Sequence, residues 1–134
     1  MQSIIKQTVE QERLSDIIFV GPVSRPLDYL CSADVFLLPS IIEGMPAVVL
    51  EAMYCRTPVV AYDVGGISEV IRNGETGWLT RAGDEGAFAN AVMEVLETPD
   101  IESIRQSAFN LVVKEFDNRV IARRFLEVYQ RLKA

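Results

Sequence analysis

Short apolar runs alternate with longer amphipathic stretches along most of the chain. Three of these runs, at residues 17–20, 35–38 and 58–62, are rich in β-branched and large apolar side chains. Such short, continuous runs are typical of strands that are buried on both faces of a parallel sheet. Because helical stretches lie between them, the order βαβαβ predicts an α/β fold with a doubly wound parallel sheet. We expect the three strands to be adjacent and parallel.

Amphipathic helices are predicted before and between the first strands. Residues 2–14 place apolar side chains, among them Ile5 and Val9, on one helical face. Ser24 is expected to cap a second helix that has Pro26 just inside its start.

The C-terminal part of the chain is predicted to be mainly helical. Residues 76–80 read as a short edge strand. Three amphipathic helices follow, near residues 85–97, over residues 101–116 and from Asn118 onward. Their apolar stripes are the kind that helices use for packing, so we expect all three to belong to the core.

Residues 39–51 connect the second predicted strand to the helix that follows it. Pro46 has the fixed φ that suits a first helical position, and good helix formers continue from there. This arrangement places Glu43, Gly44 and Met45 in a loop at the carboxyl end of the sheet, where open α/β folds bind their ligands. The loop is therefore the candidate functional segment.

The start of this helix offers the chemistry that a nucleotide requires. Unpaired N–H groups and the positive end of the helix dipole suit a phosphate, and Gly44 lets the backbone come close. Glu51 lies about five residues into the helix, roughly 7 Å along its axis, and its carboxylate could accept both hydroxyls of a ribose. The alternative is that Glu43 is a solvated loop acid and Glu51 an exposed helix residue.

Gly65 and Gly66 follow the third predicted strand and allow a tight turn into a brief helix over residues 68–72. Doubled glycine is equally compatible with a plain turn and with the close approach of a ligand. In the second case another helix start would face the same crevice.

Length, composition and charge narrow the class of protein. A chain of 134 residues with 49% hydrophobic and 24% charged residues predicts one soluble globular domain. The net charge of -6 argues against a general nucleic-acid surface. Cys31 and Cys55 are the only cysteines and the chain has no histidine, which argues against a zinc site and favours a reduced, cytoplasmic setting.

The last predicted helix carries a cluster of basic residues: Arg119, Arg123, Arg124, Arg131 and Lys133. The simplest interpretation is a solvated face, with cations near the helix C-terminus. The alternative is peripheral contact with an anionic membrane surface, such as the inner face of the cell membrane, or with a partner domain.

The stretch 39–51 resembles the donor-binding motif of the family-4 (group 1) glycosyltransferases, in which seven residues separate two glutamates. Here the two are Glu43 and Glu51. Further matches follow in order and cover nearly the whole chain: Phe19-Val20-Gly21, Glu51-Ala52-Met53, Pro58-Val59-Val60-Ala61, Val64-Gly65-Gly66-Ile67, Glu69-Val70-Ile71 and Asn73-Gly74-Glu75-Thr76-Gly77.

The resemblance implies the Rossmann-like, donor-binding half of a GT-B fold with additional C-terminal helices. It implies one partial nucleotide-sugar-binding domain over residues 1–134, with terminal helices at 116–134. The implied function is retaining transfer of a sugar from a nucleotide diphosphate sugar to an acceptor sugar or lipid-linked glycan in polysaccharide biosynthesis, without a metal or cofactor. Glu43 would be catalytic, and the implied donor-binding residues are Glu43, Gly44, Met45, Pro46, Ala47, Glu51, Val23, Gly65 and Gly66.

The chain departs from the family pattern at its N-terminal side. The two βα units that begin the family's C-terminal half, with an arginine and a lysine for the donor phosphates, have no counterpart here. The N-terminal half that binds the acceptor has none either. We therefore expect a truncated chain that needs that half as a partner and does not transfer sugar alone.

A smaller departure is Arg56, which stands where the family usually has a glycine after the motif helix. Arginine in a left-handed conformation would cost about 1 kcal/mol, so we expect the helix to end differently here.

Two alternatives to the transferase remain open. One is a nucleotide-sugar 2-epimerase, whose family relies on a histidine, and the other is a non-catalytic nucleotide-binding or scaffold domain.

Overall fold

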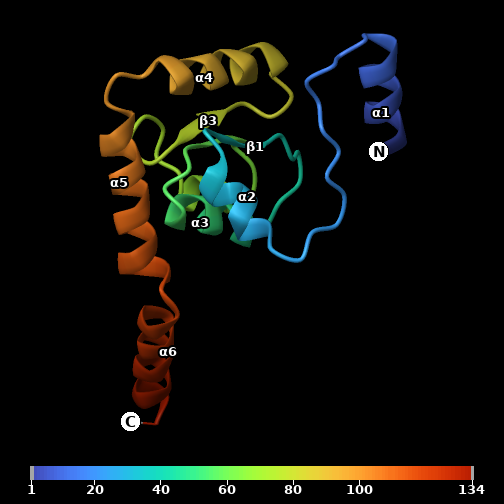
Figure 1. Ribbon diagram of the computed structural model, residues 1–134. Coiled ribbons are helices and arrows are strands. Elements are labelled where there is room, and N and C mark those ends of the chain that lie inside the picture. The colour runs from blue at the N-terminus through green and yellow to red at the C-terminus, as the bar shows by residue number, and fades with distance from the viewer. Residues whose placement is uncertain (1, 134) are drawn as a thin grey trace.

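The computed structural model describes residues 2–133 and is built on a sheet of three parallel strands (Figure 1). The strands are β1 (Phe36–Leu38), β2 (Val59–Tyr62) and β3 (Trp78–Thr80), in the order β1-β2-β3. β1 pairs with β2 in the register Phe36 opposite Val59, and β2 pairs with β3 in the register Val60 opposite Trp78. The parallel α/β sheet is thus confirmed.

Helices cover both faces of the sheet. Successive β2 side chains point to opposite faces, so each face presents apolar residues to a different set of helices. Val59 and Ala61 pack on one side with α3 (Ala47–Tyr54) and α5 (Ile101–Leu111). Val60 packs on the other side with Trp78 and with α4 (Glu85–Glu97). The doubly wound arrangement follows from this alternation, and α4 and α5 belong to the core as predicted.

Helix boundaries follow local capping. The Asp84 carboxylate accepts a hydrogen bond from the Ala87 N–H at 2.9 Å and begins α4. α2 (Pro26–Ser32) has Pro26 in its first turn as predicted, but its N-cap is Arg25 rather than Ser24 and gives no side-chain cap. Instead, the Arg25 guanidinium lies 3.0 Å from the Asp28 carboxylate, one turn into the helix.

Two further helices differ in extent from the prediction. The helix expected over residues 101–116 is regular only to Leu111 and continues as a π-helical segment, η2 (Val112–Phe116). The helix expected over residues 68–72 is a single 3₁₀ turn, η1 (Ile67–Glu69). The apolar spacing in the first case and the doubled glycine in the second predicted the position of the element but not its hydrogen-bonding pattern.

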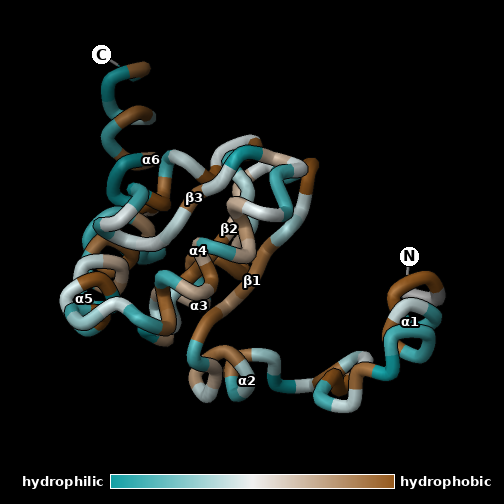
Figure 2. Tube along the Cα trace, turned by 90° about the horizontal axis from the view of Figure 1, so that it is seen from above, coloured by the Kyte–Doolittle hydropathy of each residue, from teal (hydrophilic) through white to brown (hydrophobic). Residues whose placement is uncertain are grey.

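The predicted strand at residues 17–20 is wrong. This segment forms no strand in the described structure, and Ile18 and Val20 are 84% and 48% exposed. α1 (Gln2–Gln11) stands apart from the sheet in Figures 1 and 2. It contacts the segment at residues 17–20 through Lys6, whose Nζ lies 5.4 Å from the ring centre of Phe19. An apolar run becomes a strand only where neighbouring strands and helices satisfy its backbone and cover its faces.

The expectation that the last helix packs in the core is also wrong. α6 (Asn118–Leu132) has no buried residue, and Phe125 and Leu132 are 60% and 78% exposed. The chain turns at Asp117, and α6 continues away from the sheet beyond α5 (Figure 1). The Arg124 guanidinium bonds to Glu115 across this turn and holds the pKa of that carboxyl below its ordinary value.

α3 ends in the left-handed conformation that was expected to be avoided. Arg56 has a φ of 61°, and its N–H donates to Met53 O at 3.1 Å while the Thr57 N–H donates to Ala52 O at 2.9 Å. This pair of bonds is a Schellman motif with arginine in the usual place of glycine. The Arg56 guanidinium lies 4.7 Å from the ring centre of Phe109, a contact that offsets part of the strain.

None of the helices within residues 2–133 is long and apolar enough to cross a membrane.

Candidate functional site

Two loops meet at the carboxyl edge of the sheet, one after β1 and one after β2. The Gly66 N–H donates to Gly44 O at 2.7 Å and joins the loops. Gly65 has a φ of 56°, and a Cβ there would lie 1.9 Å from Glu43 O. Gly65 is therefore required because the Glu43 backbone approaches it closely. The doubled glycine in the sequence does not indicate this contact between distant segments.

The loop at residues 39–46 leads directly into α3. Pro46 has φ −73° and ψ 115° and is the N-cap, so the helix begins at Ala47, one residue later than predicted. Pro46 gives no side-chain cap to the first turn. The Val49 N–H donates to Pro46 O at 3.1 Å, so the N–H groups of Ala47 and Val48 are those available to water or to an anion at this edge of the sheet.

The second predicted loop offers a weaker helix terminus. η1 is a single 3₁₀ turn beginning at Ile67, and its N-cap Gly66 gives no side-chain bond. A single turn aligns few peptide dipoles. The anion-binding chemistry of this edge therefore rests mainly on α3.

The two glutamates occupy different surroundings. Glu43 is half-buried in the loop beside Gly65, whereas Glu51 is exposed on α3. Glu51 and Ala47 line one cavity of about 390 Å³. Neither Glu43 nor Val23 is among the described residues that line it. Glu43 lies instead at the junction with Gly65 and Gly66, whereas Val23 is 38% exposed in the segment before α2 and joins neither group.

The cavity beside Glu51 includes residues that the sequence analysis did not select. Leu27 of α2, Tyr54 of α3 and residues 116–118 at the turn into α6 share its walls. Leu27 and Tyr54 are 46% and 56% exposed. Their apolar character predicted packing, and no local signal marks them as lining a cavity to which three separate segments contribute.

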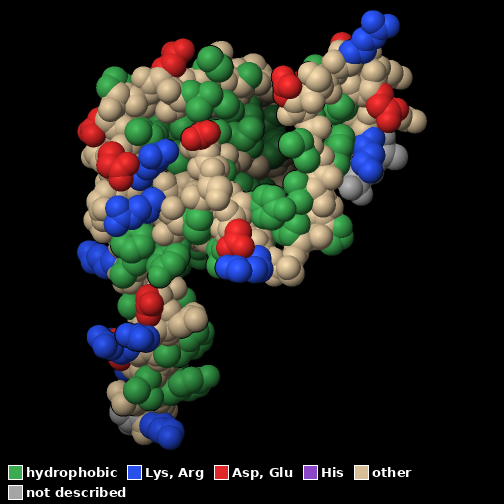
Figure 3. All heavy atoms as spheres, viewed as in Figure 1, with side chains coloured by type: hydrophobic (Ala, Val, Ile, Leu, Met, Phe, Trp, Pro, Cys, Tyr) green, Lys and Arg blue, Asp and Glu red, His purple; other side chains and the backbone are tan. Residues whose placement is uncertain are grey.

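An apolar hollow lies on the other side of the loop. It measures about 720 Å³ and is lined by Leu37, Pro39, Ile41, Tyr62 and residues of α4. Figure 3 shows hydrophobic side chains gathered around a hollow between the main body and α1. Ile41 and Ile42 are 66% and 87% exposed, so the loop presents an uncovered apolar surface beside the glutamates.

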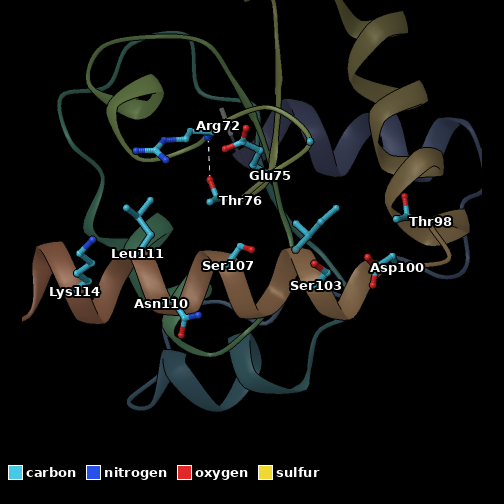
Figure 4. A pocket seen from close by; sticks show the side chains of 12 residues that line it. Arg72, Glu75, Thr76, Thr98, Asp100, Ser103, Ser107, Asn110, Leu111 and Lys114 are labelled. Atoms are coloured by element: carbon cyan, nitrogen blue, oxygen red, sulfur yellow. Dashed lines mark hydrogen bonds between the residues drawn. The ribbon is translucent and has the colours of Figure 1, made fainter.

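A polar cavity of about 720 Å³ lies away from these loops, between α5 and the turn that precedes β3 (Figure 4). Arg72 and Glu75 line it from the turn, and Ser103, Ser107 and Lys114 line it from the helical side. It opens at the amino end of β3, the opposite end of the strands from Glu43. None of the predicted site residues lines it.

Among residues 2–133, no group of three or more acidic, histidine or cysteine side chains is arranged to hold a metal ion.

Solved structures share this arrangement. HepE from Anabaena, crystallised with UDP-glucose, superposes with a TM-score of 0.88 over 96% of this chain and 36% of its own, at 25% identity. The C-terminal domain of a group 1 family glycosyl transferase from Francisella tularensis superposes with a TM-score of 0.72 over 87% of this chain and 63% of its own, at 22% identity. The fold is that of the C-terminal domain of GT-B glycosyltransferases.

The sequence comparison agrees with this class. The profile of the family described as glycosyl transferases group 1 matches residues 2–98, so the chain belongs to that family of enzymes. N-acetyl-alpha-D-glucosaminyl L-malate synthase from Bacillus anthracis is 31% identical over 93% of this chain. The match covers 33% of that relative, and the chain thus spans about a third of its length.

Proposed function

We propose that this chain binds a nucleotide diphosphate sugar at the carboxyl edge of its sheet and serves as the donor-binding part of a retaining glycosyltransferase. The observation that carries the proposal is the joint between the two loops, in which Gly66 bonds to Gly44 and Gly65 packs on Glu43. This joint fixes the loop that connects Glu43 to the uncapped start of α3. The HepE structure with UDP-glucose supports this class of ligand.

Each part of the site has a separate task in this proposal. The N–H groups of Ala47 and Val48 at the start of α3 receive the diphosphate, since unpaired N–H groups and the helix dipole both favour an anion. Glu51 lies four residues after Ala47, about 6 Å along the axis of α3, and accepts hydrogen bonds from the ribose hydroxyls. Glu43 contacts the hydroxyls of the transferred sugar.

Transfer itself requires a second body over this edge of the sheet. The apolar loop residues Ile41, Ile42 and Met45 are 66%, 87% and 40% exposed, and Glu51 is exposed on its helix. A reacting sugar there would face water rather than an acceptor held within about 3 Å. We propose that an acceptor-binding domain covers the loop and presents a sugar or a lipid-linked glycan.

The two glutamates make the proposal testable by calorimetry. We expect Glu51→Gln to weaken the nucleotide diphosphate and its sugar ester alike, because losing a charge-assisted hydrogen bond costs roughly 1.5–3 kcal/mol. Glu43→Gln should weaken only the sugar ester. Uridine, guanosine and adenosine diphosphates and their glucose esters provide the ligand panel, since the proposed contacts with the diphosphate, the ribose and the sugar do not select a base.

The matched control for this experiment is Glu94→Gln, an equally conservative change of an exposed glutamate on α4. It should leave both affinities unchanged. Equal losses for both ligands in both Glu43→Gln and Glu51→Gln, or a loss in the control, would refute the division of labour. A radiolabelled donor assay on the 134-residue chain should show no turnover above a Glu43→Ala, Glu51→Ala double variant.

A further inference from the structure

The two cysteines lie at the ends of α2 and α3, which the bond between Leu30 and Thr57 brings together. Cys31 is exposed in the last turn of α2, and Cys55 is the half-buried C-cap residue of α3. Burial raises the pKa of the Cys55 thiol to about 11, and a side-chain hydrogen bond with Cys31 adds to the shift. The nearby charge of Glu51 raises it further.

The backbone around this pair is held in place independently of the thiols. The Thr57 hydroxyl donates to Leu30 O at 2.5 Å, and both residues are buried. Cys31 follows Leu30 directly, and Cys55 lies two positions before Thr57. The ends of α2 and α3 that carry the cysteines are therefore held together by a hydrogen bond that does not involve the thiols.

We propose that Cys31 and Cys55 are an oxidisable dithiol that forms a reversible intramolecular disulfide with low-molecular-weight disulfides such as oxidised glutathione. The exposed Cys31 thiolate attacks one glutathione sulfur, forms a mixed disulfide and releases one glutathione thiol. Cys55 then loses its proton and attacks the Cys31 sulfur, which forms the protein disulfide and releases the second glutathione. Two protein thiols are oxidised by two electrons, and one glutathione disulfide is reduced.

The bond would close a loop of about 25 residues that contains β1, the loop at residues 39–46 and α3. The Cys55 N–H donates to Glu51 O at 3.0 Å, so the modified residue sits one turn from the carboxylate assigned to the donor. Cross-linking restricts the unfolded chain and ties α2 to the helix that bears Glu51. Oxidation thus stabilises the segment that carries the candidate site.

The test is to incubate the full chain in a series of oxidised and reduced glutathione mixtures, quench with acid, denature, alkylate with a maleimide and measure the intact mass. We expect a product that has lost two hydrogen atoms and carries neither maleimide nor glutathione. Peptide mapping should join the peptides of Cys31 and Cys55. Its melting temperature should be about 5 °C or more above that of the reduced chain and return with dithiothreitol.

Single variants separate the two steps. Cys55→Ser should stop at a stable mixed disulfide on the exposed Cys31. Cys31→Ser should react slowly in the folded chain, because the half-buried Cys55 thiol with its raised pKa forms little thiolate, and should react normally in urea. Glutathione adducts or intermolecular dimers in place of the internal bond, or an unchanged melting temperature after it forms, would overturn the proposal. The test uses no nucleotide and is independent of donor binding.

Discussion

Single residues define the candidate site most sharply at Gly65. A side chain there would meet the Glu43 carbonyl at 1.9 Å in a backbone conformation with φ 56° that side-chain-bearing residues rarely adopt. Gly83 has a similar φ of 80°, yet a Cβ there would meet nothing within 4 Å. The chain therefore contains a matched pair that separates backbone strain from loop contact.

Gly65→Ala should lower the free energy of unfolding by about 3 kcal/mol or more, the sum of left-handed strain and a steric clash. Gly83→Ala should lower it by only about 1–2 kcal/mol, from strain alone. Urea unfolding followed by tryptophan fluorescence measures both changes. Equal losses would mean that the loop at Glu43 yields freely and is not fixed by Gly65.

Arg56 provides a second prediction at the residue scale. Arg56→Gly removes the left-handed strain but also the contact with the Phe109 ring, so we expect a change close to zero. Arg56→Ala keeps the strain and loses the contact. The glycine variant should therefore be more stable than the alanine variant by about 1 kcal/mol in urea unfolding. An alanine variant at least as stable as the glycine variant would contradict the observed helix end.

Elements whose cues are local were predictable from sequence, and those that depend on distant partners were not. β1, β2, α4 and α5 lie where their apolar periodicity placed them. The run at residues 17–20 has the same apolar character as β1 but remains unpaired, because no other strand lies beside it in the described structure. Composition reports the tendency to be buried, and only the assembled fold determines whether burial occurs.

The same distinction applies to the candidate site: its local features were predictable from sequence, and its contacts between distant segments were not. The loop with Glu43 and the start of α3 follow from a strand, a glycine and a proline in sequence order. The contact of Gly65 with Glu43 joins segments that are distant in sequence, and the cavity wall contributed by Leu27 arises in the same way. Such contacts leave no periodic signal in the sequence. The Glu43 loop and the start of α3 were therefore predictable, but the contact between the two loops was not.

The prediction at the scale of an element concerns α6 and its contribution to stability. Because the helix has no buried residue, Phe125→Ser should change the free energy of unfolding by about 0.5 kcal/mol or less. Met53→Ala in α3 should lower it by about 2–5 kcal/mol, because Met53 is 0% exposed. Chemical unfolding of both variants is the measurement. A loss in Phe125→Ser comparable to that of Met53→Ala would show that α6 packs on the body in solution.

At the scale of the whole molecule, a compact body of three strands lies between two helices that stand away from it (Figure 2). The site is on the body, at the carboxyl edge of the sheet, while the polar cavity near Arg72 opens at the other end of the strands. The whole chain carries a net charge of -6, which disfavours anions at long range. Donor binding in this account therefore depends on local groups, chiefly the start of α3.

The most direct test of that claim is a nuclear magnetic resonance titration of the ¹⁵N-labelled full chain with the panel of nucleotide diphosphates and their glucose esters. We predict that the amide shifts of residues 43–51 and 65–67 change together, with a dissociation constant on the order of 1 mM, or about 4 kcal/mol. Shifts confined to residues around Arg72 and Lys114, or no shifts with any ligand at about 10 mM, would contradict the assignment of this edge of the sheet as the donor site.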